Sequence, residues 1–156
     1  MPLRLTSPAF ADGEHIDLKY TRLGDNASPP LEWSGAPEGT NSFAILLEDP
    51  DAPGGTFRHW AIYDIPVGTT ALAVDESVGT KLPQARNDFG ETRYDGPEPP
   101  AGHGPHRYRF SLMALAVPSL DLGPDADVAA VRAAAEPHRL EETWLLGLFA
   151  RDSKDM

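Results

Sequence analysis

Proline is the feature that most limits how this chain can fold. The 156 residues include 16 prolines and 14 glycines, spread through the sequence rather than gathered in one linker. Because proline inside a helix removes a hydrogen bond and clashes with the preceding turn, this density leaves little room for long helices. It favours short strands joined by loops. No repeat, low-complexity tract or charge block marks a boundary, so we expect residues 1–156 to form a single domain.

Four apolar runs have the length expected of β-strands. They lie at 41–48, 59–65, 106–117 and 143–150. In the third run, apolar residues occupy every second position from Tyr108 to Ala114, which places them on one face of a strand. Strands therefore dominate the predicted structure, and the natural architecture is two antiparallel sheets packed face to face.

A single segment has a clearly helical pattern, close to the C-terminus. An aspartate of the preceding segment 124–127 can cap the alanine-rich stretch 128–136, in which Val128 and Val131 lie three apart and would face the core together. Pro137 is expected to end or break this helix. The fold class we predict is thus mainly β, with one or two short helices near the C-terminus.

The charge and composition exclude several classes of function. The formal net charge is −11, which argues against a broad basic face for nucleic acid or for an anionic membrane. No apolar run is long enough to span a bilayer, so we expect no stable membrane insertion. The absence of cysteine excludes disulfides, thiolate metal sites and a cysteine nucleophile. Because the N-terminal residues lack the pattern of a secretion signal, we expect a cytoplasmic protein.

The stretch EDPDAPGGTFRHW, residues 48–60, holds two carboxylates on a stiff backbone. Each residue from Asp49 to Pro53 is either a proline or directly precedes one, so its backbone is restricted before any ligand arrives. If the strands on either side are neighbours, Asp49 and His59 face a common opening. The alternative is a rigid surface loop whose aspartates cap turns, with His59 a packed histidine.

A second cluster, YDGPEPPAGHGPHRY at 94–108, forms a long loop that leads into a strand. His106 and Tyr108 are two positions apart and so point to one face of that strand. Imidazole and phenol groups can donate to an anion, and backbone N–H groups of a glycine-bearing turn can form a concave anion nest. Arg107 points to the other face, and we expect it to be directed inward and paired with Asp51 or Glu48.

These motifs resemble the phosphatidylethanolamine-binding proteins. The residues that carry the resemblance are DPDAP (49–53) with HW (59–60), NDFG (87–90), YDGPEPPAG (94–102) and HRYRFSL (106–112). The resemblance covers roughly residues 5–151. Only GGTFR separates the first two motifs, and the chain ends just past its last predicted strand, both of which are similar to the prokaryotic, Raf-kinase-inhibitor-like branch.

The resemblance implies a β-sandwich of two antiparallel sheets with a small anion pocket at one end. In the family, this pocket binds phosphate, acetate, cacodylate or a phosphoethanolamine head group. By the matching motifs, the ligand-binding residues here would be Asp49, Pro53, His59, Gly96, Pro100, His106 and Tyr108. Asp51 and Arg107 match positions with a supporting role. The resemblance to prokaryotic members also implies a homodimer.

The predicted function is therefore a non-catalytic binding protein for a phosphate, phosphoethanolamine-like or carboxylate group, either free or carried on a protein partner. The alternative is a kinase or protease inhibitor that acts through its surface, with the pocket regulatory. A hydrolase is disfavoured because no G-x-S-x-G elbow occurs and Ser111 is the only serine near either cluster. The spacing of His103 and His106 is not diagnostic of a metal site. We expect no catalytic residue, no metal and no cofactor.

Overall fold

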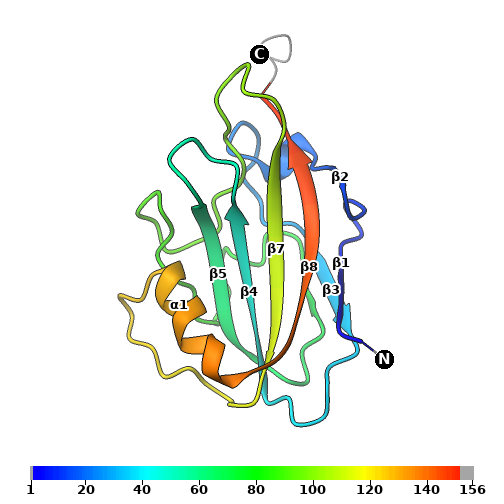
Figure 1. Cartoon of the computed structure of the whole chain (residues 1–156), viewed down its shortest axis with the longest axis vertical. Helices are drawn as coiled ribbons and strands as arrows, with labels where there is room; N and C mark the ends of the chain where they lie inside the picture. The colour runs from blue at the N-terminus through cyan, green and yellow to red at the C-terminus, as the bar shows by residue number, and fades with distance from the viewer. Residues whose placement is uncertain (1, 152–156) are drawn as a thin grey trace.

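The computed structural model describes residues 2–151, which form two β-sheets and one α-helix (Figure 1). The larger sheet has the strand order β2-β8-β7-β4-β5 and the smaller sheet the order β1-β3-β6. The strands are β1 (Arg4–Thr6), β2 (Glu14–His15), β3 (Leu31–Ser34), β4 (Ser42–Asp49), β5 (Phe57–Pro66), β6 (Ala71–Leu72), β7 (His106–Leu115) and β8 (Arg139–Phe149). The helix α1 spans Val128–Ala135, and short 3₁₀ helices cover Leu18–Tyr20 and Glu136–His138.

The four predicted strands are confirmed as β4, β5, β7 and β8. The largest difference in bounds is at β8, which begins at Arg139 rather than at residue 143. Three of its first four residues are charged, but this end of β8 pairs with the far end of β7, where Leu115 lies opposite Arg139. Pairing along a long neighbouring strand thus extends β8 beyond its apolar run.

The two-sheet prediction is confirmed, with one departure from purely antiparallel pairing. The short edge strand β2 pairs with β8 in parallel, Glu14 opposite Gly147 and His15 opposite Leu148. Every other strand pair is antiparallel among residues 2–151. The larger sheet is therefore mixed at this edge.

The hydrophobic core fills the space between the two sheets. Leu5 and Trp33 from the smaller sheet pack in one cluster with Phe43 of β4 and Phe110 of β7. Tyr108, Phe110, Leu112 and Ala114 all belong to this cluster, as their spacing predicted. Burying this apolar surface stabilises the fold by roughly 25 cal/mol per Å² removed from water.

Helix α1 covers part of the outer face of the larger sheet. Asp127 caps the helix by accepting a hydrogen bond from the backbone N–H of Ala130 at 2.8 Å. Val128 and Val131 are buried, and together with Leu46 of β4 they form a second apolar cluster. The strand β4 is buried on both faces for this reason, which explains why its sequence is a continuous apolar run.

The topology brings the two predicted site clusters to one end of the molecule. Because β4 and β7 are antiparallel, the end of β4 lies beside the start of β7 (Figure 1). β5 begins at the same end, since Asp49 pairs with Phe57. Within residues 2–151, no helix has the length and apolar character to cross a bilayer.

Candidate functional site

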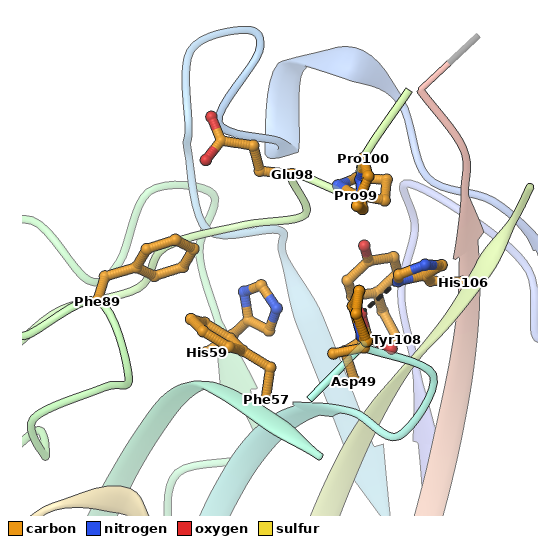
Figure 2. A pocket seen from close by; sticks show the side chains of 11 residues that line it. Asp49, Phe57, His59, Phe89, Glu98, Pro99, Pro100, His106 and Tyr108 are labelled. Atoms are coloured by element: carbon orange, nitrogen blue, oxygen red, sulfur yellow. Dashed lines mark hydrogen bonds and ion pairs between the residues drawn. The ribbon is translucent and has the colours of Figure 1, made fainter. Parts of the chain in front are cut away.

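A cavity of about 180 Å³ opens at this end of the sheet (Figure 2). Its lining comes from β4, β5, β7 and the loops between them. The lining residues are Asp49, Ala52, Pro53, Phe57, His59, Phe89, Glu98, Pro99, Pro100, His106 and Tyr108. Six of the seven residues predicted to bind a ligand are therefore brought together, and Gly96 is the one that lies outside the lining.

Asp49 is the last residue of β4 and is almost completely buried. Its Oδ1 accepts a hydrogen bond from the backbone N–H of Asp51 at 2.8 Å, so the carboxylate also shapes the turn that follows. Its Oδ2 lies 2.6 Å from Nδ1 of His106, which is equally buried. A buried carboxylate and a buried imidazole thus stabilise one another at the cavity wall.

His106 has a second partner on its other ring nitrogen. Its Nε2 is hydrogen-bonded to Nδ1 of His103, an exposed residue of the loop before β7. Asp49, His106 and His103 therefore form a continuous chain of hydrogen bonds from the cavity to the protein surface. Sequence reasoning considered His103 only as a metal ligand. Among residues 2–151, no group of three or more His, Asp or Glu side chains is arranged to hold a metal ion.

His59 is held in a different way. Its Nδ1 lies 2.8 Å from the backbone carbonyl oxygen of Asp95, and a carbonyl oxygen can only accept a hydrogen bond. Nδ1 therefore carries the proton, and in the neutral imidazole Nε2 is left as the acceptor. Burial lowers the pKa of His59 below its usual value, although the Asp95 carbonyl and the Asp49 carboxylate oppose this shift.

The carbonyl of Asp95 is positioned by a buried polar network. Its side chain is fully buried and accepts hydrogen bonds from Asn26 and Asn87, both at 2.8 Å. Gly96 follows directly, and its N–H donates to Asn26 Oδ1 at 2.7 Å. A Cβ atom at Gly96 would collide with the carbonyl oxygen of Tyr20, so only glycine allows this close approach. Gly96 thus supports His59 from behind the cavity wall.

Tyr108 contributes a phenol group beside the two histidines. Its ring lies 5.5 Å from the His59 ring and 6.2 Å from the His106 ring, centroid to centroid. Burial, reinforced by the negative charges of Asp49 and Asp51, raises the pKa of Tyr108 well above its usual value. The hydroxyl group therefore stays protonated and can donate a hydrogen bond.

Aromatic rings and prolines form the rest of the wall. Phe57 and Phe89 pack edge to face with their centroids 4.7 Å apart, and both lie beside the His59 ring. Sequence reasoning did not assign either residue to the site. Phe57 could have been found, because it is two positions before His59 on the same strand and so shares its face. Phe89 belongs to the NDFG motif, but only the fold brings it to the cavity.

The prediction that Arg107 points inward is wrong, although its predicted partner is right. It pairs with Asp51 as expected, Nη2 to Oδ1 at 2.8 Å and Nε to Oδ2 at 3.0 Å, and this lowers the pKa of Asp51 to about 2. It does not point inward, since 58% of its side chain is exposed. Glu48 is instead paired with Arg132 of α1 at 2.7 Å. Helix α1 covers only part of the outer sheet face, and Arg107 lies on the part that it leaves open.

Comparison with known proteins adds three kinds of match. The family model described as phosphatidylethanolamine-binding protein matches residues 6–150. A UPF0098 protein of Aquifex aeolicus is 44% identical over 155 residues, covering 96% of this chain and 90% of that protein. The crystal structure of Escherichia coli YbcL, described as a member of the mammalian PEBP family, superposes with a TM-score of 0.90. It is 32% identical, over 96% of this chain and 99% of that one.

A second solved structure gives the same result. The phosphatidylethanolamine-binding protein homologue CT736 of Chlamydia trachomatis is 31% identical and has a TM-score of 0.88. The match covers 97% of this chain and 99% of that one. The similarity in sequence and in structure therefore extends over nearly the whole length of the chain.

Proposed function

This chain belongs to the phosphatidylethanolamine-binding protein family, and from that premise we propose that it is a non-catalytic binding protein whose cavity takes a phosphoryl or carboxylate group. The observation that carries the proposal is the meeting of His59, His106 and Tyr108 with the buried carboxylate of Asp49 in one cavity. Tyr108 can donate to an anion directly and His59 can donate once its Nε2 is protonated, whereas both ring nitrogens of His106 are bonded to Asp49 and His103.

The electrostatics of the cavity support a ligand that brings its own proton or positive charge. In the unliganded cavity, burial favours neutral His59, whose Nε2 is then an acceptor. A charged His59 would donate to an anion, and the anion would offset the cost of burying the charge. Asp49 next to that anion requires a shared proton or an ammonium group between them. A hydrogen phosphate or a zwitterionic head group meets both conditions.

The size and the walls of the cavity support a small head group rather than a whole ligand. Its volume of about 180 Å³ is below the roughly 300–1,000 Å³ that encloses a drug-sized molecule. Phe57, Phe89 and Pro53 present an apolar wall beside the polar groups. We propose that the anionic head enters the cavity and that any apolar part of the ligand lies along this wall.

The lining also supports binding over the hydrolase considered from the sequence. Among the described residues, the cavity wall includes no serine. Ser111 is buried in the middle of β7, where Nη2 of Arg132 donates to its hydroxyl at 3.4 Å. A triad of Asp49, His59 and Ser111 would need these groups within hydrogen-bond reach of each other, and Ser111 is committed elsewhere.

Titration with phosphate and with phosphoethanolamine, followed by NMR of the histidine side chains between about pH 5 and pH 8, tests the proposal. We expect the His59 and His106 signals to move on ligand addition, and binding to strengthen as the pH falls through the usual histidine pKa of roughly 6.5. His138 lies far from the cavity on the 3₁₀ helix after α1 and serves as the internal control. Unchanged His59 and His106 signals would show that the cavity is not an anion site.

A further inference from the structure

The hydrogen-bonded chain Asp49–His106–His103 links the buried cavity to solvent. Asp49 and His106 are 3% and 2% exposed, whereas His103 is an exposed loop residue. His103 lies between Gly102 and Gly104, which have positive φ values of 74° and 82°. These two glycines form the turn that places the His103 ring against His106. His103 does not itself line the cavity.

The donors and acceptors in the chain have one consistent arrangement when both imidazoles are neutral. The Asp49 carboxylate only accepts, so Nδ1 of His106 carries a proton. Nε2 of His106 is then an acceptor, and Nδ1 of His103 must donate to it. This leaves Nε2 of His103 as an unprotonated nitrogen at the exposed end of the chain.

One added proton can travel along the chain without loss of any hydrogen bond. It binds Nε2 of His103 from water, and the Nδ1 proton of His103 moves to Nε2 of His106. The Nδ1 proton of His106 can then move to Oδ2 of Asp49. The result is a protonated Asp49, two neutral imidazoles with reversed donor direction, and a net gain of one proton.

We propose that His103 is a positioning residue for ligand binding, the solvent-facing end of a proton relay that supplies the proton Asp49 needs when an anion enters the cavity. This inference rests on the proposed function, since an anion beside an ionised Asp49 would be repelled. The relay allows the cavity to change its protonation state while Asp49 and His106 stay buried. His103 acts through His106 and need not touch the ligand.

Asp49 is the carboxylate that receives the proton of the relay, because the other carboxylates nearby are paired with arginines. Six titratable or charged groups surround the hydrogen-bonded chain Asp49–His106–His103. They are Asp51 after β4, His59 on β5, Arg107 and Tyr108 on β7, Glu98 in the loop before β7, and Arg151 after β8. Asp51 is neutralised by its bidentate pair with Arg107. Glu98 is paired with Arg22 at 3.0 Å. Asp49 is bonded to His106 and to the backbone N–H of Asp51, and the Tyr108 hydroxyl lies near it.

His59 cannot take this role, although it lines the same cavity. Its Nδ1 proton is committed to the Asp95 carbonyl oxygen, which cannot be protonated in its place. A proton added to His59 therefore remains on its Nε2. The two histidines thus differ in the number of protonation states that each can reach while keeping its hydrogen bonds.

The tautomer of His103 is the sharpest test, because ¹⁵N NMR distinguishes a protonated Nδ1 from an unprotonated one. We expect inorganic phosphate, added to the full-length protein at about pH 7.5, to convert His103 from the Nδ1–H to the Nε2–H tautomer. Calorimetry in buffers of different ionisation enthalpy should show uptake of about one proton per bound phosphate. As the pH rises, the affinity for phosphate should fall by about tenfold per pH unit in the range where this proton uptake limits binding.

Two variants separate the relay from the pocket itself. His103→Gln keeps a hydrogen-bonding side chain on the exposed loop but cannot carry a proton, so phosphate should associate with it about threefold more slowly or worse at pH 7.5, because the relay sets the rate at which Asp49 gains its proton. His138→Gln, an exposed control, should bind at the wild-type rate. If phosphate moves the His59 signal but leaves the His103 tautomer and the His103→Gln association rate unchanged, the relay is wrong and the binding site stands. If phosphate moves neither His59 nor His106, the proposed function itself is wrong.

Discussion

The two buried histidines of the cavity differ in what holds them. His59 donates to a backbone carbonyl, that of Asp95, and this bond fixes its tautomer. His106 faces a carboxylate on one side and a second imidazole on the other, and both of these partners can exchange a proton. The fixed half of the cavity is therefore the wall with His59, whose protonated nitrogen is set by the Asp95 carbonyl. The adjustable half is the wall with Asp49 and His106, whose protons can move between the partners.

This difference follows from where the partners lie in the chain. Asp95 belongs to a loop whose side chains are occupied by a buried network, so its carbonyl is a rigid acceptor. Asp49 is separated from His106 by 57 residues and meets it only because β4 and β7 are adjacent. His59 is held in one orientation and can orient an anion once its Nε2 is protonated, while the wall with Asp49 and His106 can accommodate the charge of the anion.

Removing the Asp49 carboxylate should have the largest effect on the free energy of unfolding. Asp49→Ala leaves buried His106 and the Asp51 N–H without their acceptor, and we expect it to lower the free energy of unfolding by about 3–5 kcal/mol. Asp49→Asn retains an acceptor oxygen, and neutral His106 can reverse its tautomer to accept from the amide, so the loss should be about 1 kcal/mol. Urea unfolding at pH 7 measures both. Equal losses in the two variants would mean that charge, rather than hydrogen bonding, dominates this wall.

A substitution at Gly96 should disturb the fixed half of the cavity, because Gly96 follows the Asp95 carbonyl that holds His59. Gly96→Ala pushes a Cβ atom against the Tyr20 carbonyl oxygen and so displaces the peptide that carries the Asp95 carbonyl. Backbone shifts of this kind typically cost about 1–3 kcal/mol. The His59 NMR signals should move, while those of His106 stay close to wild type. Gly54→Ala is the matched control, because no atom lies within 4 Å of a Cβ at that position.

The histidines on both walls of the cavity could be predicted from the sequence, but the group that holds His59 could not. Asp49, His106 and Tyr108 are at the ends of strands with clear apolar patterns, so their meeting follows once β4 and β7 are neighbours. Asp95 gave no such signal, because its function is carried by a backbone carbonyl and its side chain is buried through long-range bonds to Asn26 and Asn87. Sequence patterns report side chains much better than they report the direction of a carbonyl.

The fold shows a similar division. The larger sheet was predictable because β4 and β7 carry long apolar runs, and α1 because alanine and a capping aspartate favour helix. The strands of the smaller sheet were not predicted individually, since β1, β3 and β6 have only three, four and two residues. Strands this short form through packing of residues such as Leu5 and Trp33 against the larger sheet, and this packing is not visible in local periodicity.

The fixed histidine should produce a measurable pH dependence of stability. Because burial lowers the pKa of His59 in the folded protein, the unfolded chain binds a proton there below pH of about 6.5 when the folded protein does not. His59 therefore makes the unfolding free energy fall as the pH decreases through 6.5, by up to about 1.4 kcal/mol per pH unit. We expect the stability difference between wild type and His59→Gln to shift in favour of the variant from pH 8 to pH 5. Parallel stability curves in urea would contradict a neutral, buried His59.

The smallest effect on stability is expected for the exposed ion pair between Arg107 and Asp51. Arg107→Ala removes a surface ion pair, which contributes little to stability in water. Its partner Asp51 has a folded pKa of about 2 against an ordinary value of 3.8, so the contribution is present above pH 3.8 and is lost as the pH falls through about 2. Because the Asp51 N–H donates to Asp49, the NMR signals of His106 should shift slightly in Arg107→Ala, and those of His59 should not. A shift at His59 of equal size would show that the two halves of the cavity are coupled through the loop at 50–56.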